Sequence, residues 1–125
     1  MKSIRISDAE SRVMKYLWDT GSATASEVVE ALASANGWTE PTVKTLLNRL
    51  KNKGALAVRV DGRRYVYTPK LAREDWLLEE STDLIDRLFD GRLAPLVSHF
   101  SSHGRLSDRD LAELRALIER LDDGH

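Results

Sequence analysis

The sequence of 125 residues contains no cysteine. This absence excludes a disulfide framework, a thiolate nucleophile and a cysteine-based metal site, and it gives no support to secretion. No stretch approaches the roughly 18 apolar residues of a membrane span, and the first residues, MKSIRIS, lack the apolar core of a signal peptide. We therefore expect a soluble, cytoplasmic protein with no membrane insertion.

The formal net charge is also small, at -1, but the charged residues are unevenly distributed along the chain. Residues 1–70 hold twelve basic and seven acidic side chains, a formal charge of +5, whereas residues 71–125 hold seven basic and thirteen acidic ones, a charge of -6. A basic half suits a nucleic-acid partner even though the pI of the whole chain is near 6.3. The change in charge near Pro69 predicts two domains, residues 1–70 and 71–125.

Motifs for catalysis are missing as well. The sequence has no Ser/His/Asp arrangement, no phosphate-binding glycine loop and no zinc-protease motif, so we expect neither an enzyme nor a bound cofactor. His99 and His103 have the i, i+4 spacing of two metal ligands on one helix face. However, the sequence places no third ligand and a break is expected between them, so no metal site is predicted.

Capping signals predict three helices in the first half of the chain. Ser7-Asp8-Ala9-Glu10 and Thr24-Ala25-Ser26-Glu27 both have the capping-box form, and each precedes an amphipathic run. The first helix is expected to end near Gly21 and the second at Asn36-Gly37. Thr39 is expected to cap the third helix.

The third helix has two contrasting faces. Its apolar residues, Val43, Leu46, Leu47 and Leu50, follow the i, i+3, i+4, i+7 spacing of a buried stripe. The opposite face carries Thr42, Lys44, Thr45, Asn48, Arg49 and Lys51, and no acidic residue follows Glu40 in this helix. A basic face with many hydrogen-bonding groups indicates a partner that is anionic and patterned, which fits nucleic acid.

A hairpin is predicted after the third helix. Residues 56–61 and 64–68 show strand-like alternation, and Asp61-Gly62 is a typical hairpin turn. Three helices followed by a hairpin describe a winged helix-turn-helix domain, which makes the fold class mainly α with a small β-hairpin. Arg59, Arg63 and Arg64 lie on or beside the hairpin tip, close to where a phosphate backbone runs when the third helix lies in a groove.

The second half of the chain reads as three further helices. They are expected over residues 71–89, over residues 93–100 and after a Ser107 cap, with a loop over residues 101–105. Such short helices form little interior of their own, and their apolar stripes are rich, so we expect them to pack against a second copy of the chain. The residues predicted for dimerisation are Trp76, Leu77, Leu84, Leu88, Leu96, Phe100, Leu114, Leu117 and Ile118.

Taken together, several of these runs resemble a known family. TVKTLLNRLKNKGAL, the wing exit GRRYVYTP, and the segments LVSHF and LSDRDLAELRALI are similar to the penicillinase and methicillin-resistance repressors, the BlaI/MecI family. The opening SDAESRVMKYLW is also similar, so the resemblance covers nearly the whole chain. It implies a homodimeric transcriptional repressor that binds a palindromic double-stranded operator through a winged-helix domain and dimerises through a helical C-terminal domain.

The resemblance also implies roles for individual residues. Thr42, Thr45, Asn48 and Arg49 are expected to read bases in the major groove. Lys44, Lys53, Arg63, Arg64 and Tyr65 are expected to contact phosphates. The chemistry agrees, because Arg can bind guanine in a bidentate manner, Asn can pair with adenine, and a Thr methyl can contact the thymine methyl.

A release mechanism comes with the resemblance too. In the best-known members of the family, a membrane receptor signal leads to proteolysis between an Asn and a Phe in the dimerisation domain. The matching position here is His99-Phe100, where the Phe agrees and the preceding residue departs. The resemblance therefore implies a regulatory protease as a partner, and the departure weakens that implication.

One alternative from another class stays open. A winged-helix domain can also serve as a protein-interaction module that binds no DNA and works through the acidic helical half. Reversing Lys44, Arg49 and Arg63 to Glu separates the two hypotheses, because it should leave such a protein interaction intact.

Overall fold

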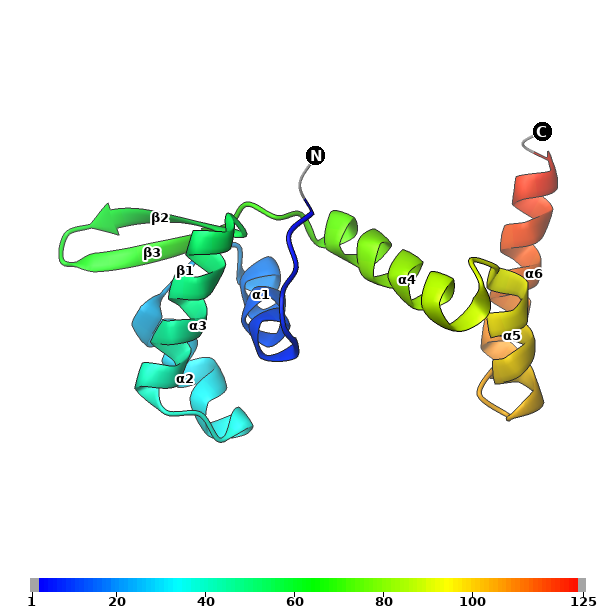
Figure 1. Cartoon of the computed structure of the whole chain (residues 1–125), viewed down its shortest axis with the longest axis horizontal. Helices are drawn as coiled ribbons and strands as arrows, with labels where there is room; N and C mark the ends of the chain where they lie inside the picture. The colour runs from blue at the N-terminus through cyan, green and yellow to red at the C-terminus, as the bar shows by residue number, and fades with distance from the viewer. Residues whose placement is uncertain (1–2, 124–125) are drawn as a thin grey trace. The chain divides into compact units, whose positions relative to one another are not determined.

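The computed structural model describes residues 3–123 (Figure 1). The elements in chain order are α1 (Asp8–Thr20), β1 (Ala23–Thr24), α2 (Ala25–Asn36), α3 (Glu40–Lys53), β2 (Leu56–Asp61), β3 (Arg64–Pro69), α4 (Arg73–Phe89), α5 (Leu93–Ser102) and α6 (Asp108–Asp123). The predicted fold class, mainly α with a winged helix-turn-helix, is confirmed. Within residues 3–123, no helix has the length and apolar character needed to span a membrane.

The chain divides into two compact units, one ending at Leu78 and the other beginning at Glu79. Helix α4 therefore contributes its first turns to the N-terminal unit and its remainder to the C-terminal unit. The boundary between the two domains predicted from charge, between residues 70 and 71, stays a prediction.

The first two helices begin where their capping signals place them. The Ser7 hydroxyl accepts a hydrogen bond from the Glu10 amide at 3.1 Å, and the Ser7 amide donates to the Glu10 carboxylate at 2.7 Å. Thr24 and Glu27 repeat this reciprocal pair at 3.2 and 2.9 Å. Each capping box satisfies amide groups that a helix start leaves without an intrahelical partner, so both starts are fixed by four consecutive residues.

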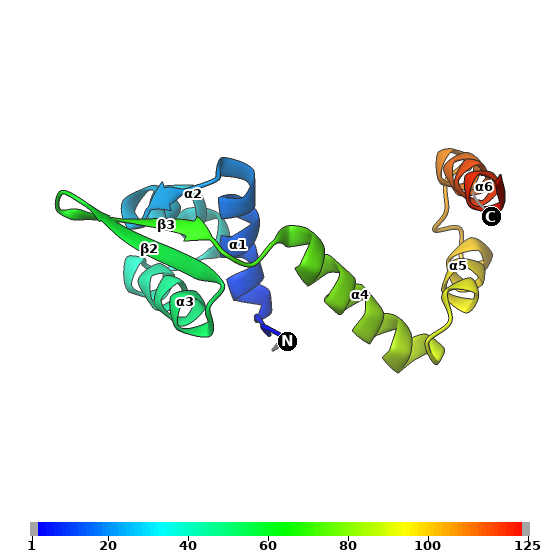
Figure 2. The same ribbon diagram turned by 90° about the horizontal axis from the view of Figure 1, so that it is seen from above.

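The sheet has three antiparallel strands in the order β1-β3-β2. Strand β1 pairs Ala23 with Tyr67, and β2 pairs Val58 with the same tyrosine from the other side. Figure 2 shows β2 and β3 continuing as a hairpin beyond the helices of this unit. Strand β1 was missed in the sequence because two residues are too few for an alternating pattern.

The hairpin turn lies one residue later than predicted. Asp61 pairs with Arg64, so the two turn residues are Gly62 and Arg63 instead of Asp61 and Gly62. Gly62 has φ 64°, and a positive φ at the first turn position is what a type II′ hairpin requires. The consequence is that Arg63 occupies the tip of the wing.

The hydrophobic core lies in the N-terminal unit. Its largest buried apolar side chains are Val13, Met14, Leu17, Val28, Val43, Leu46, Leu47, Leu50 and Leu56. The predicted apolar stripe of α3 is thus buried against α1, α2 and the base of the hairpin. Because that stripe is fully used, the opposite face of α3 is left to solvent.

The C-terminal unit lacks such a core. Among the described residues, α4, α5 and α6 contain no buried residue. Helix α5 also continues to Ser102, two residues beyond its predicted end. The loop expected over residues 101–105 was wrong in its first two positions, because the break falls at Gly104, which has φ 67°.

Candidate nucleic-acid interface

The outer face of α3 is exposed along its length. Thr42, Lys44, Thr45, Asn48, Arg49 and Lys51 all lie on the surface. Thr39 begins the helix by accepting a hydrogen bond from the Thr42 amide at 3.3 Å. The burial of one stripe therefore orients all the predicted base-reading residues outward together.

Most of this face is available to a partner. Within residues 3–123, no hydrogen bond or ion pair engages the side chains of Thr45, Asn48 or Arg49. Lys44 pairs with Glu40 at 3.0 Å, but both side chains are more than half exposed. Such a surface pair contributes little, so Lys44 can exchange its partner for a phosphate at small cost.

A cleft of about 390 Å³ lies between the wing, the start of α2 and Lys44 of α3. It is lined by Thr24, Ala25, Ser26, Lys44, Arg63, Arg64, Tyr65 and Tyr67. The sequence had identified its three cations and Tyr65, but not Tyr67. The sequence signal for Tyr67 was its position two residues after Tyr65, because residues two apart lie on the same face of a strand. The cleft combines positive charge with hydroxyl groups, which suits phosphate oxygens.

The hydroxyl of Tyr67 remains a donor in this cleft. Burial is the main cause that raises its pKa, the neighbouring Tyr65 raises it further, and Lys44 opposes the rise. A phenol whose pKa lies above its ordinary value is protonated at neutral pH. Tyr67 can therefore donate a hydrogen bond to an anion without adding negative charge.

The tip of the wing presents Arg63 and Arg64 to solvent. Arg64 makes a long ion pair with Asp61 at 3.4 Å, and both side chains are more than half exposed. No ion pair engages Arg63 among the residues described. Both guanidinium groups are thus open to an external phosphate.

Lys53, predicted to contact phosphate, has a partner inside the protein. Its ammonium lies 2.6 Å from Glu10, whose side chain is 2% exposed. Burial acts most strongly on the pKa of Glu10 and raises it, but the hydrogen bonds from Lys53 and Ser7 prevail and the pKa is lowered. Sequence reasoning missed this pair because the capping box already accounted for a Glu at that position.

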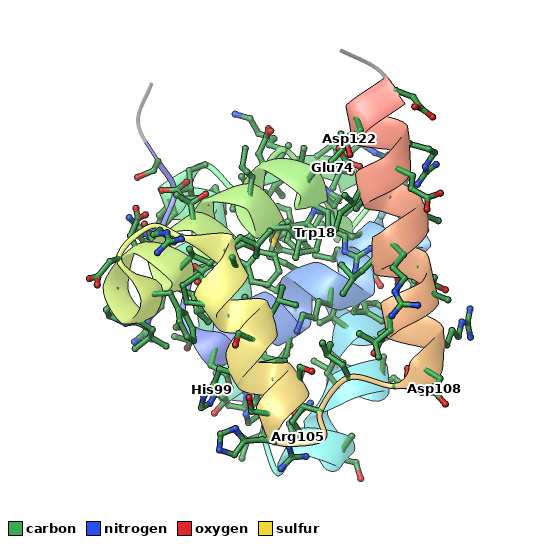
Figure 3. The ribbon with its side chains drawn as sticks, turned by 90° about the vertical axis from the view of Figure 1, so that its right-hand side faces the viewer. Trp18, Glu74, His99, Arg105, Asp108 and Asp122 are labelled. Carbon is green, nitrogen blue, oxygen red and sulfur yellow. The ribbon has the colours of Figure 1, made fainter. Side chains whose placement is uncertain are left out.

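Trp76, predicted for dimerisation, packs within the N-terminal unit. Its ring, from the first turn of α4, lies 5.4 Å from the ring of Trp18 in α1. Trp18 is labelled in Figure 3. The Trp18 indole nitrogen donates to the Leu71 carbonyl at 2.8 Å, and the Lys15 ammonium lies 5.7 Å from the Trp76 ring centre. The structure thus gives Trp76 an intrachain role that the sequence did not indicate.

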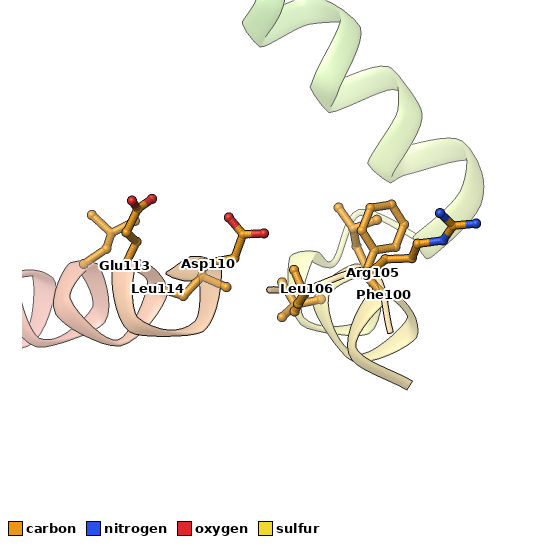
Figure 4. Close-up of a pocket in the computed structure, with 9 residues that line it drawn as sticks. Phe100, Arg105, Leu106, Asp110, Glu113 and Leu114 are labelled. Carbon is orange, nitrogen blue, oxygen red and sulfur yellow. The ribbon is translucent and has the colours of Figure 1, made fainter. Parts of the chain in front are cut away.

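The other residues predicted for dimerisation lie on α4, α5 and α6. Leu77, Leu84, Leu88, Phe100, Leu117 and Ile118 are exposed, and Leu96 and Leu114 are half-buried. A cavity of about 510 Å³ opens between α5 and α6, with Phe100 and Arg105 on one side and Asp110, Glu113 and Leu114 on the other (Figure 4). An apolar cavity of about 600 Å³ is lined by Leu93, Leu111, Ile118 and Leu121 among others.

Comparison with known protein families gives a match over most of the chain. A family model described as "Penicillinase repressor" matches residues 6–120. The penicillinase repressor of Bacillus licheniformis is 37% identical over 120 residues, which cover 95% of this chain and 94% of that relative. The methicillin resistance regulatory protein MecI of Staphylococcus aureus strain N315 is 28% identical over 119 residues, covering 95% and 97%.

Solved structures give a match of the same kind. The solution structure of the DNA binding domain of the repressor BlaI matches with a TM-score of 0.55 and 43% identity, covering 60% of this chain and 93% of that one. The Bacillus licheniformis BlaI monomeric form, solved in complex with the blaP half-operator, matches with a TM-score of 0.53 at the same identity and coverage.

Proposed function

The chain belongs to the penicillinase repressor family, and we propose on that premise that it represses transcription as a homodimer on a palindromic operator. DNA-binding transcriptional repression is the function of this family, and its members are not a class of enzymes. The symmetric operator, the homodimer, a cytoplasmic location and the roles of single residues are our proposals.

One observation carries the proposal: the exposed face of α3 and the wing form a continuous set of donors with no acidic residue among the base-reading positions. Within residues 3–123, no hydrogen bond or ion pair engages the side chains of Thr45, Asn48 and Arg49 on that face. Lys44 and Arg63 border the adjacent cleft. This arrangement is the one expected of a helix that contacts base edges in the major groove and a wing that contacts the neighbouring phosphates.

Within this surface, two sets of residues act differently. Thr42, Thr45, Asn48 and Arg49 read bases, and Lys44, Arg63, Arg64 and Tyr65 bind phosphates. Tyr67 joins the second set because it lines the same cleft and its protonated hydroxyl can donate a hydrogen bond. Lys53 belongs to that set only if it leaves Glu10 when DNA binds.

The second copy of the chain occupies the apolar faces of the C-terminal unit. In the part of the chain that the structure describes, its three helices bury no residue, and Leu88, Phe100 and Ile118 are among the large side chains that they expose. A contiguous apolar surface of this kind marks an interaction site. A two-fold partner also doubles the base contacts of a single recognition helix, which suits an operator made of two half-sites.

Release of the operator is proposed to follow cutting of the His99-Phe100 bond by a regulatory protease. Both side chains are exposed near the end of α5, where local unfolding costs little. His99 stands where the best-known members of the family have Asn, so the protease has to accept an imidazole at that position.

The test is an equilibrium titration of the full chain on duplex DNA from the promoter of its own operon, with a shuffled duplex as control. We expect tighter binding to the promoter duplex and an affinity that falls steeply as salt rises. A charge-reversed variant, with Lys44, Arg49 and Arg63 all changed to Glu, should lose this binding. Equal binding to both duplexes would contradict sequence-specific repression.

The dimer is tested separately by analytical ultracentrifugation. The wild-type chain should sediment as a dimer, and Ile118→Glu should shift it toward the monomer, because a carboxylate in an apolar interface is left unpaired. Lys51→Glu, on the surface of α3, is the matched control and should sediment as wild type. A monomeric wild-type chain at micromolar concentration would contradict the proposed dimer.

A further inference from the structure

His99, in the last turn of α5, and His103, the residue that caps this helix, lie close together. The expected break between His99 and His103 is absent, because α5 runs through Ser102 and His103 caps its end. The two imidazole ring centres are 4.5 Å apart, with their planes tilted by 45°. Two imidazole rings thus lie side by side at the end of α5, on a segment that the proposed DNA interface does not use.

The spacing fits one shared metal ion. Two imidazoles bound at right angles, each about 2.1 Å from an ion, hold their ring centres about 4.5 Å apart. The observed separation has this value.

One of the two ligands is already fixed in its tautomer. His103 Nδ1 lies 2.8 Å from the carbonyl oxygen of His99. A carbonyl oxygen only accepts, so Nδ1 carries the proton and Nε2 keeps its lone pair. A backbone carbonyl that holds the second ring nitrogen of a histidine is the usual support of a histidine metal ligand.

The pair is also accessible. Both histidines are exposed, and neither lines the cavities between α5 and α6. Figure 3 shows His99 on the side of α5 that faces away from α6. A second copy of the chain that fills these cavities would therefore leave the two imidazoles exposed.

We propose that His99 and His103 form a chelating site for a divalent transition-metal ion of the Cu²⁺, Ni²⁺ or Zn²⁺ class. Imidazole nitrogen is a preferred ligand of these ions. The described residues contain no cluster of three or more His, Cys, Asp or Glu side chains that could hold a metal. Water therefore completes the shell, and the ion exchanges readily, unlike a closed structural zinc.

The ion has a mechanical consequence for α5. Its two ligands lie on either side of Phe100, so the ion ties together the last turn of the helix. A protease cuts a helical bond only after local unfolding, and a ligand that binds only the folded turn opposes that opening. At an ion concentration about ten times the dissociation constant, the open population falls about tenfold.

Calorimetric titration of the full chain, without an affinity tag, with NiCl₂ and separately with ZnCl₂ tests the site. We expect saturable binding of at least one ion, weakened at least tenfold in both His99→Gln and His103→Gln. The third histidine of the sequence, His125, lies outside the described residues, and His125→Gln is the matched control that should bind as wild type. No binding, or binding that survives either of the first two substitutions, would overturn the proposal.

Cleavage by chymotrypsin after Phe100, followed by mass spectrometry, gives a second readout. The bound ion should slow this cut about tenfold in the wild-type chain and leave its rate unchanged in His103→Gln. Equal protection in both proteins would place the ion elsewhere in the chain and overturn the proposal. Neither readout depends on DNA, so a failure here is distinct from a failure of the proposed repression.

Discussion

The ammonium of Lys53 lies 2.6 Å from a carboxylate oxygen of Glu10 and thereby ties the last turn of α3 to the first turn of α1. The Glu10 side chain is 2% exposed, whereas that of Lys53 is 40% exposed. Water therefore reaches the ammonium of the pair but hardly reaches the carboxylate. The second carboxylate oxygen of Glu10 is buried and has no hydrogen-bond partner among the described residues. Lys53 is therefore the cation that compensates a buried carboxylate whose other hydrogen bond comes from the Ser7 amide.

Removing the Lys53 ammonium should destabilise the fold. Lys53→Met keeps the aliphatic stem but leaves the Glu10 carboxylate buried and poorly paired, which should lower the free energy of unfolding by about 1–3 kcal/mol. Urea denaturation at pH 7 measures this. Lys51→Met, an exposed neighbour on the same helix, should change stability by less than about 0.5 kcal/mol. Equal effects of the two substitutions would contradict the role given to the pair.

The same variant separates a structural role from a phosphate contact. With Lys53 held by Glu10, the salt dependence of DNA binding should keep its slope in Lys53→Met. A phosphate contact would instead reduce the slope by about 1. A reduced slope would mean that Lys53 leaves Glu10 when DNA binds and takes up the phosphate contact that the family resemblance implied.

The pair also predicts an acid dependence of stability. The pKa of Glu10 in the folded chain is lowered from its ordinary value of 4.5, so the unfolded chain binds its proton first as pH falls. The stabilisation is present above pH 4.5 and is lost as pH falls through the lower, folded pKa. Urea midpoints between pH 6 and pH 3 should fall more for the wild type than for Glu10→Gln. Parallel curves would show that Glu10 titrates normally.

Truncation of Arg49 and truncation of Arg63 should impair DNA binding in different ways. Arg49→Ala should reduce the preference for the operator over shuffled DNA by about 1–3 kcal/mol, because it removes a base contact. Arg63→Ala should weaken binding to both duplexes alike and reduce the salt slope by about 1, because it removes a phosphate contact. Fluorescence anisotropy on both duplexes at four salt concentrations measures the two effects. Identical patterns would contradict the division into base-reading and phosphate-binding residues.

The Trp18 and Trp76 indoles offer a matched pair of substitutions. Trp18→Phe removes the hydrogen bond to the Leu71 carbonyl, whereas Trp76→Phe removes an N–H that is buried without a partner among the described residues. Both changes delete the same atoms, so Trp18→Phe should cost about 1 kcal/mol more free energy of unfolding. Thermal denaturation compares them. A larger loss in Trp76→Phe would mean that its N–H is satisfied in solution.

Local signals in the sequence were sufficient for most elements of the fold. Capping boxes at Ser7 and Thr24 involve residues three apart, and the buried stripe of α3 follows from its own spacing, so neither needs a distant partner. The outward face of α3 follows from that stripe. For these reasons the winged helix, and the outward orientation of the polar face of α3, could be predicted before the structure.

Features that join distant segments could not be predicted. Lys53 is 43 residues from Glu10, and Trp18 is 53 residues from Leu71, so no local sequence pattern indicates either contact. The one-residue shift of the wing turn depends on how β2 and β3 pair, and the extra residues of α5 depend on where Gly104 ends it. These are the points at which packing, rather than composition, decides the structure.

Hydroxyl-radical footprinting of the full chain on the promoter of its own operon tests the central claim most directly. A homodimer that reads DNA with two copies of α3 predicts two protected half-sites whose centres lie about 10 base pairs or a multiple of that apart. The protection should disappear in the charge-reversed variant of Lys44, Arg49 and Arg63. Protection that is uniform along the fragment, or absent, would contradict the account.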